Sequence, residues 1–193
     1  MNTIDFETML KGHLEEHARV VAVLADCAPE IGRISAAWLD CLRQGGKIFF
    51  FGNGGSAADA QHLAAELVVR YRINRRALAG IALTTDTSVL TAHSNDFGFE
   101  TVYARQIEAL ARPGDVVIGI STSGTSRNVI EGLRAANAVG CVTIAFTGAA
   151  GGECAALASL ALKVPSIVTA HVQESHLLIG HVLCEAVEAA FSD

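Results

Sequence analysis

His62 and Glu66 lie four residues apart in the segment FFGNGGSAADAQHLAAEL, which spans residues 50–67. On an α-helix, residues at this spacing share one face, about one turn apart. An imidazole and a carboxylate on one face can hold a metal ion or move protons, although most pairs of this kind are only solvated. Here the neighbours are alanine and leucine, and Arg70 continues the same face. The pair is therefore a candidate site that needs partners from elsewhere in the chain.

Candidate partners lie in the C-terminal segment HVQESHLLIGHVLCEAVEAA, which carries Gln173 and His181. At ~1.5 Å of rise per residue, the two are roughly 12 Å apart along a continuous helix. That separation is near the limit for two side chains that meet at one ion. Either Gln173 lies before the regular helix begins, or the two residues act in different sites, which requires a neighbouring subunit. A histidine among leucine and valine is also commonly a core residue.

Two loops have the composition of an anion site. GNGGS at 52–56 places glycines before a helix, although a plain strand-to-helix turn explains this pattern equally well. STSGTS at 121–126 is a run of hydroxyls ahead of another helix, and ordinary N-capping needs only one of them. Hydroxyls and helix N-terminal amides donate to phosphate oxygens, and the helix dipole favours the charge. Neither loop matches a dinucleotide or nucleotide motif, so a small phosphorylated compound is expected.

The elements that position these loops alternate regularly along the chain. Five short apolar runs are separated by helical patterns, which predicts parallel strands buried on both faces and joined by crossover helices. Ligands of such sheets bind outside the carboxyl ends of the strands. Strands are expected at KIFFFG (47–52), AGIALT (79–84), DVVIGIS (115–121), VTIAFTG (142–148) and LALKVPS (160–166), and helices near 57–70, 99–111, 126–138 and 170–191.

The N-terminal region has helical periodicity over 4–27 and 34–42. We therefore expect one domain over 1–193, with a helical extension at 1–45 and a doubly wound α/β core at 46–193. His13 and His17 lie four residues apart in the first helix. This spacing permits metal binding, but we expect an interface or solvent-facing role for them.

Composition excludes several classes of protein. A net charge of -6 with no basic block argues against binding to nucleic acid or acidic membranes. No apolar stretch approaches the ~18 residues that a bilayer requires, and the N-terminus does not read as a secretion signal, so a cytoplasmic location is expected. The five cysteines are widely spaced, form no CxxC pair and are interpreted as core residues.

The segment TTDTSVLTAHSNDFGFE follows the second apolar run and adds three polar side chains to the same region. Asp86 is explained by turn or cap chemistry. Asn95 and Asp96 remain ambiguous on residue type alone, because an Asn-Asp pair also begins helices well.

Four motifs, in this order and spacing, resemble the phosphoheptose isomerases of the sugar isomerase (SIS) domain superfamily: GNGGSAADAQHLAAEL, SNDFGFE, GISTSGTSRNVI and QESHLLIGHVLCEAVE. The similarity covers nearly the whole chain. It implies a five-stranded parallel SIS fold and a homotetramer with active sites at subunit interfaces. It also implies interconversion of sedoheptulose 7-phosphate and D-glycero-D-manno-heptose 7-phosphate, the entry step to the heptoses of bacterial surface polysaccharide.

The resemblance assigns roles position by position. The phosphate cradle is expected at Ser121, Thr122, Ser123 and Ser126, the turn that lines the sugar at Asn53, Gly54 and Gly55, a further substrate contact at Asn95 and Asp96, and one Zn²⁺ per subunit at His62, Glu66, Gln173 and His181. Glutamine is an unusual zinc ligand, but its amide oxygen is chemically acceptable.

Isomerisation moves one proton between adjacent carbons and another between their oxygens, so it needs a base and an acid. The resemblance assigns these roles to Glu66 and His181, which are also expected metal ligands. The assignments compete, since a lone pair on zinc cannot take a proton. Our hypothesis is that zinc polarises the carbonyl while Glu66 shifts its coordination as substrate binds; normal activity of a Glu66→Gln variant would contradict it.

Two segments depart from the family pattern. SIVTAHVQ at 166–173 has no acid before the glutamine, which leaves Asp96 as the reserve base. INRRALAG at 73–80 replaces a proline-rich turn, so the path of that loop is open.

Two other functions compete with this one. A relative within the superfamily is a non-catalytic tetramer that binds the replication initiator DnaA, and it lacks the acid and imidazole present here at Glu66 and His181. A SIS isomerase or sensor for another sugar phosphate is the third interpretation.

Overall fold

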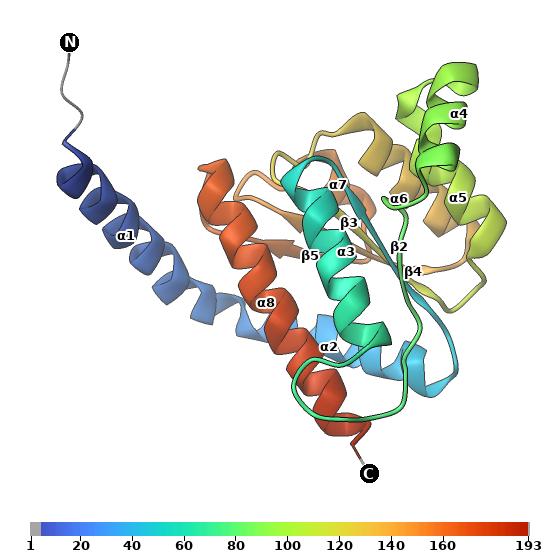
Figure 1. Ribbon diagram of the computed structural model, residues 1–193, viewed down its shortest axis with the longest axis horizontal. Coiled ribbons are helices and arrows are strands. Elements are labelled where there is room, and N and C mark those ends of the chain that lie inside the picture. Colours follow the sequence, from blue (N-terminus) through green and yellow to red (C-terminus); the bar gives the residue numbers. More distant parts are fainter. Residues whose placement is uncertain (1–4, 193) are drawn as a thin grey trace.

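The computed structural model describes residues 5–192, which form one five-stranded parallel sheet with helices on both faces (Figure 1). The strands are β1 (Ile48–Gly52), β2 (Gly80–Ala82), β3 (Val116–Ser121), β4 (Val142–Thr147) and β5 (Leu160–Lys163), in the order β2-β1-β3-β4-β5. All five coincide with the predicted apolar runs. The strand order reverses direction between β1 and β3, which is where ligands bind in open α/β sheets.

Each face of the sheet has its own hydrophobic core. In β1, Ile48 and Phe50 point to one core and Phe49 and Phe51 to the other, as expected from the alternation of side chains along a strand. The first core is covered by α2 (Ala28–Arg43), α3 (Gly55–Val68) and α8 (Thr169–Ala190), and the second by α5 (Val102–Leu110), α6 (Arg127–Val139) and α7 (Gly152–Leu157). The strands are thus buried on both sides, and the doubly wound prediction is confirmed.

The N-terminal extension consists of α1 (Phe6–Val23), a 3₁₀ turn (Leu24–Cys27) and α2. Residue 4, where the first helix was predicted to begin, lies outside the described residues. α2 begins six residues earlier than predicted, with Pro29 in its first turn, a position where the missing N–H costs nothing. Trp38 of α2 is fully buried in the first core, whereas α1 runs outward from the body (Figure 1) and buries only Val20.

Two helices were not predicted, α4 (Thr87–Phe97) and the short α7. α4 occupies a segment for which no helix was expected, because threonine, serine and asparagine have weak helix propensity. Asp86 is its N-cap and accepts a hydrogen bond from the Val89 N–H at 3.0 Å, which confirms the cap interpretation of Asp86. The predicted helix at 99–111 is a 3₁₀ turn (Phe99–Thr101) followed by α5.

Within residues 5–192, no helix is both long and apolar enough to cross a membrane. Four of the cysteines are buried and Cys27 is partly buried, and all five are free thiols. This agrees with their interpretation as small core residues.

Candidate active site at the carboxyl ends of β1 and β3

Asn53 and Asn128 join the two central loops of the sheet. Asn53 follows β1, and Asn128 lies in the first turn of α6, behind β3. Their amides exchange two hydrogen bonds, of 2.9 Å and 2.8 Å, and Asn128 is buried. The glycine turn and the hydroxyl loop are therefore locked side by side at the point where the strand order reverses.

The hydroxyls of the loop after β3 face one another. Ser121 Oγ lies 2.8 Å from Ser126 Oγ and 3.5 Å from Ser123 Oγ, and Thr125 Oγ1 donates to Ser123 Oγ at 2.9 Å. Ser126 occupies the N-cap of α6, yet its side chain makes no capping hydrogen bond. These hydroxyls are therefore not used for capping, and the α6 N-terminus keeps its favourable potential for an anion.

Gly124 gives this loop its shape. Its φ of +69° is disfavoured for other residues, and a Cβ there would collide with the backbone of Gly151. Cys154 N–H donates to the Gly124 carbonyl at 2.9 Å, and Gly148 N–H donates to the Thr122 carbonyl at 3.0 Å. The loop is thus held by its neighbour after β4 and offers its hydroxyls from a fixed position.

His62, Glu66 and His181 meet between α3 and α8. His62 Nε2 lies 2.9 Å from His181 Nε2 and 3.2 Å from Glu66 Oε1. One donor atom from each of the three side chains lies within 4.8 Å of the others. A tetrahedral ion about 2.1 Å from its ligands separates neighbouring donors by roughly 3.4 Å, so the observed spacing fits a divalent metal. Two imidazoles and a carboxylate are also a suitable donor set for a transition metal.

Gln173 lies apart from these three donors. α8 begins at Thr169, so Gln173 is inside the regular helix, and the alternative in which it precedes the helix is wrong. Its amide covers the start of α3: a Cβ on Gly55 would come within 2.6 Å of Gln173 Nε2. Within one chain, Gln173 therefore faces the glycine turn, about two helical turns from His181.

The loop between α3 and β2 packs against the cluster of His62, Glu66 and His181. The Glu188 carboxylate accepts hydrogen bonds from the N–H groups of Tyr71, Arg72 and Ile73 at 2.9, 2.7 and 2.9 Å. Burial alone would raise the pKa of Glu188, but these donors and Arg75 hold it below its ordinary value. The path of this loop, which the sequence left open, is thus set by one buried acid on α8.

Arg75, in the same loop, links Glu188 of α8 to the C-terminal end of α3. Its side chain is 1% exposed, and its guanidinium lies 3.9 Å from Glu188 and donates to the carbonyls of Glu66 and Leu67 at 2.7 and 2.9 Å. It therefore satisfies carbonyls at the C-terminal end of α3. Tyr71, Arg75 and Glu188 were not predicted as site residues. The signal in the sequence was an acid in a largely apolar part of α8, together with an arginine-rich segment before β2.

Asp59 was also missed, although it precedes His62 by three residues and shares its helical face. Burial raises its pKa, and the positive charge of a protonated His62 opposes that effect. Its Oδ2 is buried and finds no hydrogen-bond partner within residues 5–192. Cys184, one turn after His181, is buried too, and burial together with the Glu66 charge raises its pKa to about 12, so this thiol stays protonated.

Asn95 and Asp96 are not brought into the cluster. They lie at the end of α4, where Asn95 Nδ2 donates to Asp96 Oδ1 at 2.8 Å, and both are exposed. α4 packs on α5 and the 3₁₀ turn before it, away from α8 (Figure 1).

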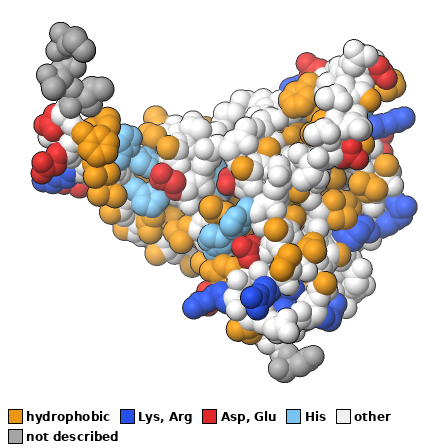
Figure 2. Space-filling model, viewed as in Figure 1, with side chains coloured by type: hydrophobic (Ala, Val, Ile, Leu, Met, Phe, Trp, Pro, Cys, Tyr) orange, Lys and Arg blue, Asp and Glu red, His pale blue; other side chains and the backbone are white. Residues whose placement is uncertain are grey.

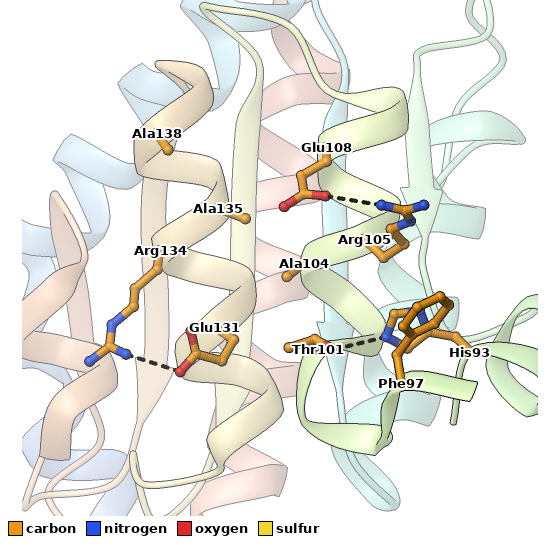
Figure 3. A pocket seen from close by; sticks show the side chains of 10 residues that line it. All are labelled: His93, Phe97, Thr101, Ala104, Arg105, Glu108, Glu131, Arg134, Ala135 and Ala138. Atoms are coloured by element: carbon orange, nitrogen blue, oxygen red, sulfur yellow. Dashed lines mark hydrogen bonds and ion pairs between the residues drawn. The ribbon is translucent and has the colours of Figure 1, made fainter. Parts of the chain in front are cut away.

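A cavity of about 430 Å³ opens on the other face, between α4, α5 and α6 (Figure 3). Arg105 and Glu108 pair across one side of it, Arg134 and Glu131 across the other, and His93 bonds the Thr101 hydroxyl at 2.9 Å. Its charged groups are thus already paired. None of the site residues expected from the sequence is among the described residues that line it.

The chain resembles known proteins in both sequence and fold. The SIS domain family matches residues 14–148. The chain is 58% identical over 185 residues to the phosphoheptose isomerase of Paramagnetospirillum magneticum, covering 95% of this chain and 96% of that protein. It is 56% identical over 161 residues to that of Aquifex aeolicus, covering 83% and 84%. The structure of phosphoheptose isomerase GmhA from Neisseria gonorrhoeae matches with a TM-score of 0.90 and 42% identity, over 95% of this chain and 99% of that one. A Francisella tularensis phosphoheptose isomerase matches with a TM-score of 0.93 and 32% identity, over 96% and 100%.

Proposed function

The chain belongs to the phosphoheptose isomerases, within the SIS domain family, and on that premise we propose that it interconverts sedoheptulose 7-phosphate and D-glycero-D-manno-heptose 7-phosphate at the crevice beside β1 and β3. The observation that supports this location best is the meeting of His62 and Glu66, on the helix that follows the glycine turn, with His181 of α8. In this proposal the acid, the base and the metal ligands share one crevice with a loop suited to an anion.

The phosphate end of the substrate is assigned to Ser121, Thr122, Ser123 and Ser126. The uncapped first turn of α6 and the facing hydroxyls support this assignment, because they supply donors and a positive dipole end together. The sugar chain then extends along Asn53, Gly54 and Gly55 toward α8, where Gln173 faces the same turn.

The proton transfers are assigned to Glu66 and His181. Glu66 takes a proton from C1 of the ketose and returns it to C2, while His181 gives a proton to the oxygen on C2 and takes one from the oxygen on C1. Glu66 Oε1 faces His62, which leaves Oε2 for the carbon-bound proton. The Tyr71 ring stacks on His181, with centroids 5.5 Å apart, and so restricts its rotation.

We assign one Zn²⁺ per subunit to His62, Glu66 and His181. When bound, the ion supplies Lewis-acid polarisation of the substrate carbonyl. A bound ion would compete with the carbon-bound proton for the Glu66 carboxylate, so a shift in Glu66 coordination on substrate binding remains part of the proposal.

A homotetramer with active sites at subunit interfaces would account for the predicted site residues that lie far from His62, Glu66 and His181 within one chain. Gln173 as a fourth ligand, and Asn95 with Asp96 as substrate contacts, would then serve the site of a neighbouring subunit. Exposed apolar side chains along one stripe of α1, including Phe6, Leu10 and Leu14, support such an assembly. We also keep a cytoplasmic location as part of the proposal, with the product passing to surface-polysaccharide heptose synthesis.

The test is turnover of sedoheptulose 7-phosphate by the purified protein before and after chelation, with metal content measured on the same sample. Formation of the aldose that is lost on chelation and restored by Zn²⁺ is the expected result. Turnover that survives complete metal removal would overturn the metal assignment and leave the isomerase intact.

The same assay separates the alternatives. Conversion of a hexose phosphate in preference to the heptose would favour another sugar phosphate as the substrate. A folded protein without turnover of either sugar would favour a DnaA-binding tetramer, against which the presence of both Glu66 and His181 argues.

A further inference from the structure

A second histidine-carboxylate cluster lies between α1 and α8. His17 comes from α1, and His171 and Glu174 come from the start of α8, three residues apart on one face. The Nδ1 atoms of His17 and His171 lie 2.8 and 3.0 Å from the same oxygen, Glu174 Oε2. One donor atom from each side chain lies within 4.8 Å of the other two.

Hydrogen bonding alone does not account for this arrangement. His171 Nδ1 makes a hydrogen bond with Glu174. His17 Nδ1 comes closer to that carboxylate, yet it is shielded from water and has no partner of hydrogen-bond geometry within residues 5–192. A buried polar nitrogen without a partner costs about 1–3 kcal/mol, so a ligand that accepts its lone pair would remove a penalty.

The space beside His17, His171 and Glu174 has room for an ion and is close to a further histidine. A cavity of about 390 Å³ opens beside the cluster, lined otherwise by His13 and by leucines of α1 and α8. His13 lies one helical turn before His17, and its ring centroid is 5.9 Å from that of His171. Figure 2 shows histidines gathered in two separate places on this face, one along α1 and one over the middle of the molecule, each beside an acidic group.

We propose that His17, His171 and Glu174 bind a second divalent transition-metal ion of the Zn²⁺ class. Imidazole and carboxylate are suitable ligands for zinc, and three protein ligands are enough to hold the ion. The site is separate from the one formed by His62, Glu66 and His181, and it does not depend on the function proposed above.

Such an ion would attach α1 to the body of the protein. α1 has one buried residue, Val20, near its C-terminal end, so little else within residues 5–192 holds its N-terminal turns to α8. His17 and Glu174 are 36% and 51% exposed as side chains, which leaves a path for an ion to enter.

The decisive measurement is zinc content per chain after equilibration of the full-length protein with Zn²⁺ and desalting. Wild type is expected to hold two ions per chain, His17→Ala one, His62→Ala one, and the double variant none. Glu15→Gln is the matched control and should keep both ions, because Glu15 is exposed on α1 and its one ion pair within residues 5–192 is with Lys11. Equal zinc content in wild type and His17→Ala would overturn the proposal.

A second measurement distinguishes loss of the metal site from misfolding of the variant. Zn²⁺ should slow amide hydrogen exchange across residues 6–23 in wild type and leave it unchanged in His17→Ala. His17→Cys, which restores a zinc ligand but not an imidazole, should recover the lost ion. Slowed exchange in His17→Ala, or no recovery of the ion by His17→Cys in a folded protein, would each contradict the site.

Discussion

The ring of Tyr71 stacks on the ring of His181, with planes 27° apart, and the Tyr71 N–H donates to Glu188, two helical turns further along α8. One acidic side chain therefore sets the loop that restrains the proposed catalytic histidine.

Replacing Glu188 with glutamine should lower the free energy of unfolding by about 3 kcal/mol, because Arg75 stays buried with a weakened partner and a backbone N–H loses its acceptor. Urea unfolding measures this. Glu185→Gln is the matched control on the same helix, where an exposed pair with Arg72 contributes little. Equal losses in the two variants would show that the buried network is not what holds the loop.

Replacing Glu66 with glutamine should reduce turnover by about 10²–10⁴-fold, because the amide cannot take the carbon-bound proton. Sedoheptulose 7-phosphate should still bind, which calorimetry can detect. Near-normal turnover would show that Glu66 is not the base and would favour Asp96, the reserve candidate for that role.

Replacing Ser123 with alanine should lower kcat/KM by roughly 10–100-fold for the phosphorylated sugar, as expected for one lost hydrogen bond to a charged group. Inhibition by inorganic phosphate should weaken in parallel, while thermal stability should hardly change because Ser123 is exposed. Ser35→Ala on α2 is the control for loss of a hydroxyl. Unchanged phosphate inhibition in Ser123→Ala would place the phosphate elsewhere.

His176 makes stability depend on pH. Burial lowers its pKa from 6.5 to about 4, only partly offset by its hydrogen bond to the Thr147 carbonyl. The folded protein thus keeps a neutral imidazole where the unfolded chain already binds a proton. Its contribution is fully present above pH 6.5 and is lost as pH falls toward 4, up to about 3 kcal/mol.

Chemical unfolding across this pH range, on wild type and on His176→Gln, checks the prediction. The glutamine amide can still donate to the Thr147 carbonyl but does not titrate. The variant should show a flatter decline than wild type between pH 6.5 and 4, and parallel declines would assign the acid sensitivity to other groups.

The strands were predictable because each is a short apolar run between helical segments. The hydroxyls after β3 were predictable as a cluster, and their role as an anion-binding loop stays a prediction. α4 was missed because its threonines and serines have weak helix propensity, and tertiary contacts with α5 decide its conformation. The spacing of Gln173 and His181 left two alternatives open. The start of α8 at Thr169 excludes the one in which Gln173 precedes the helix.

The remaining parts of the sites depend on contacts between segments distant in the sequence. His17 was visible as half of a histidine pair on α1, but its carboxylate partner is Glu174, far along the chain. Arg75 and Glu188 likewise meet only in the folded protein. Local periodicity carries no information on such pairs, since it reports the face of an element and not what packs on it.

The paired amides of Asn53 and Asn128 fix the span between the hydroxyl loop and the start of α3. If the phosphate binds among the serines and the carbonyl lies beside Glu66, as proposed, this rigid span would disfavour a sugar phosphate one carbon shorter. Discrimination of chain length would then reside in a hydrogen-bonded pair that performs no chemistry. Asn128→Ala should reduce the preference for heptose over hexose phosphates. An unchanged ratio of the kcat/KM values for the two sugars would show that another feature sets the preferred chain length.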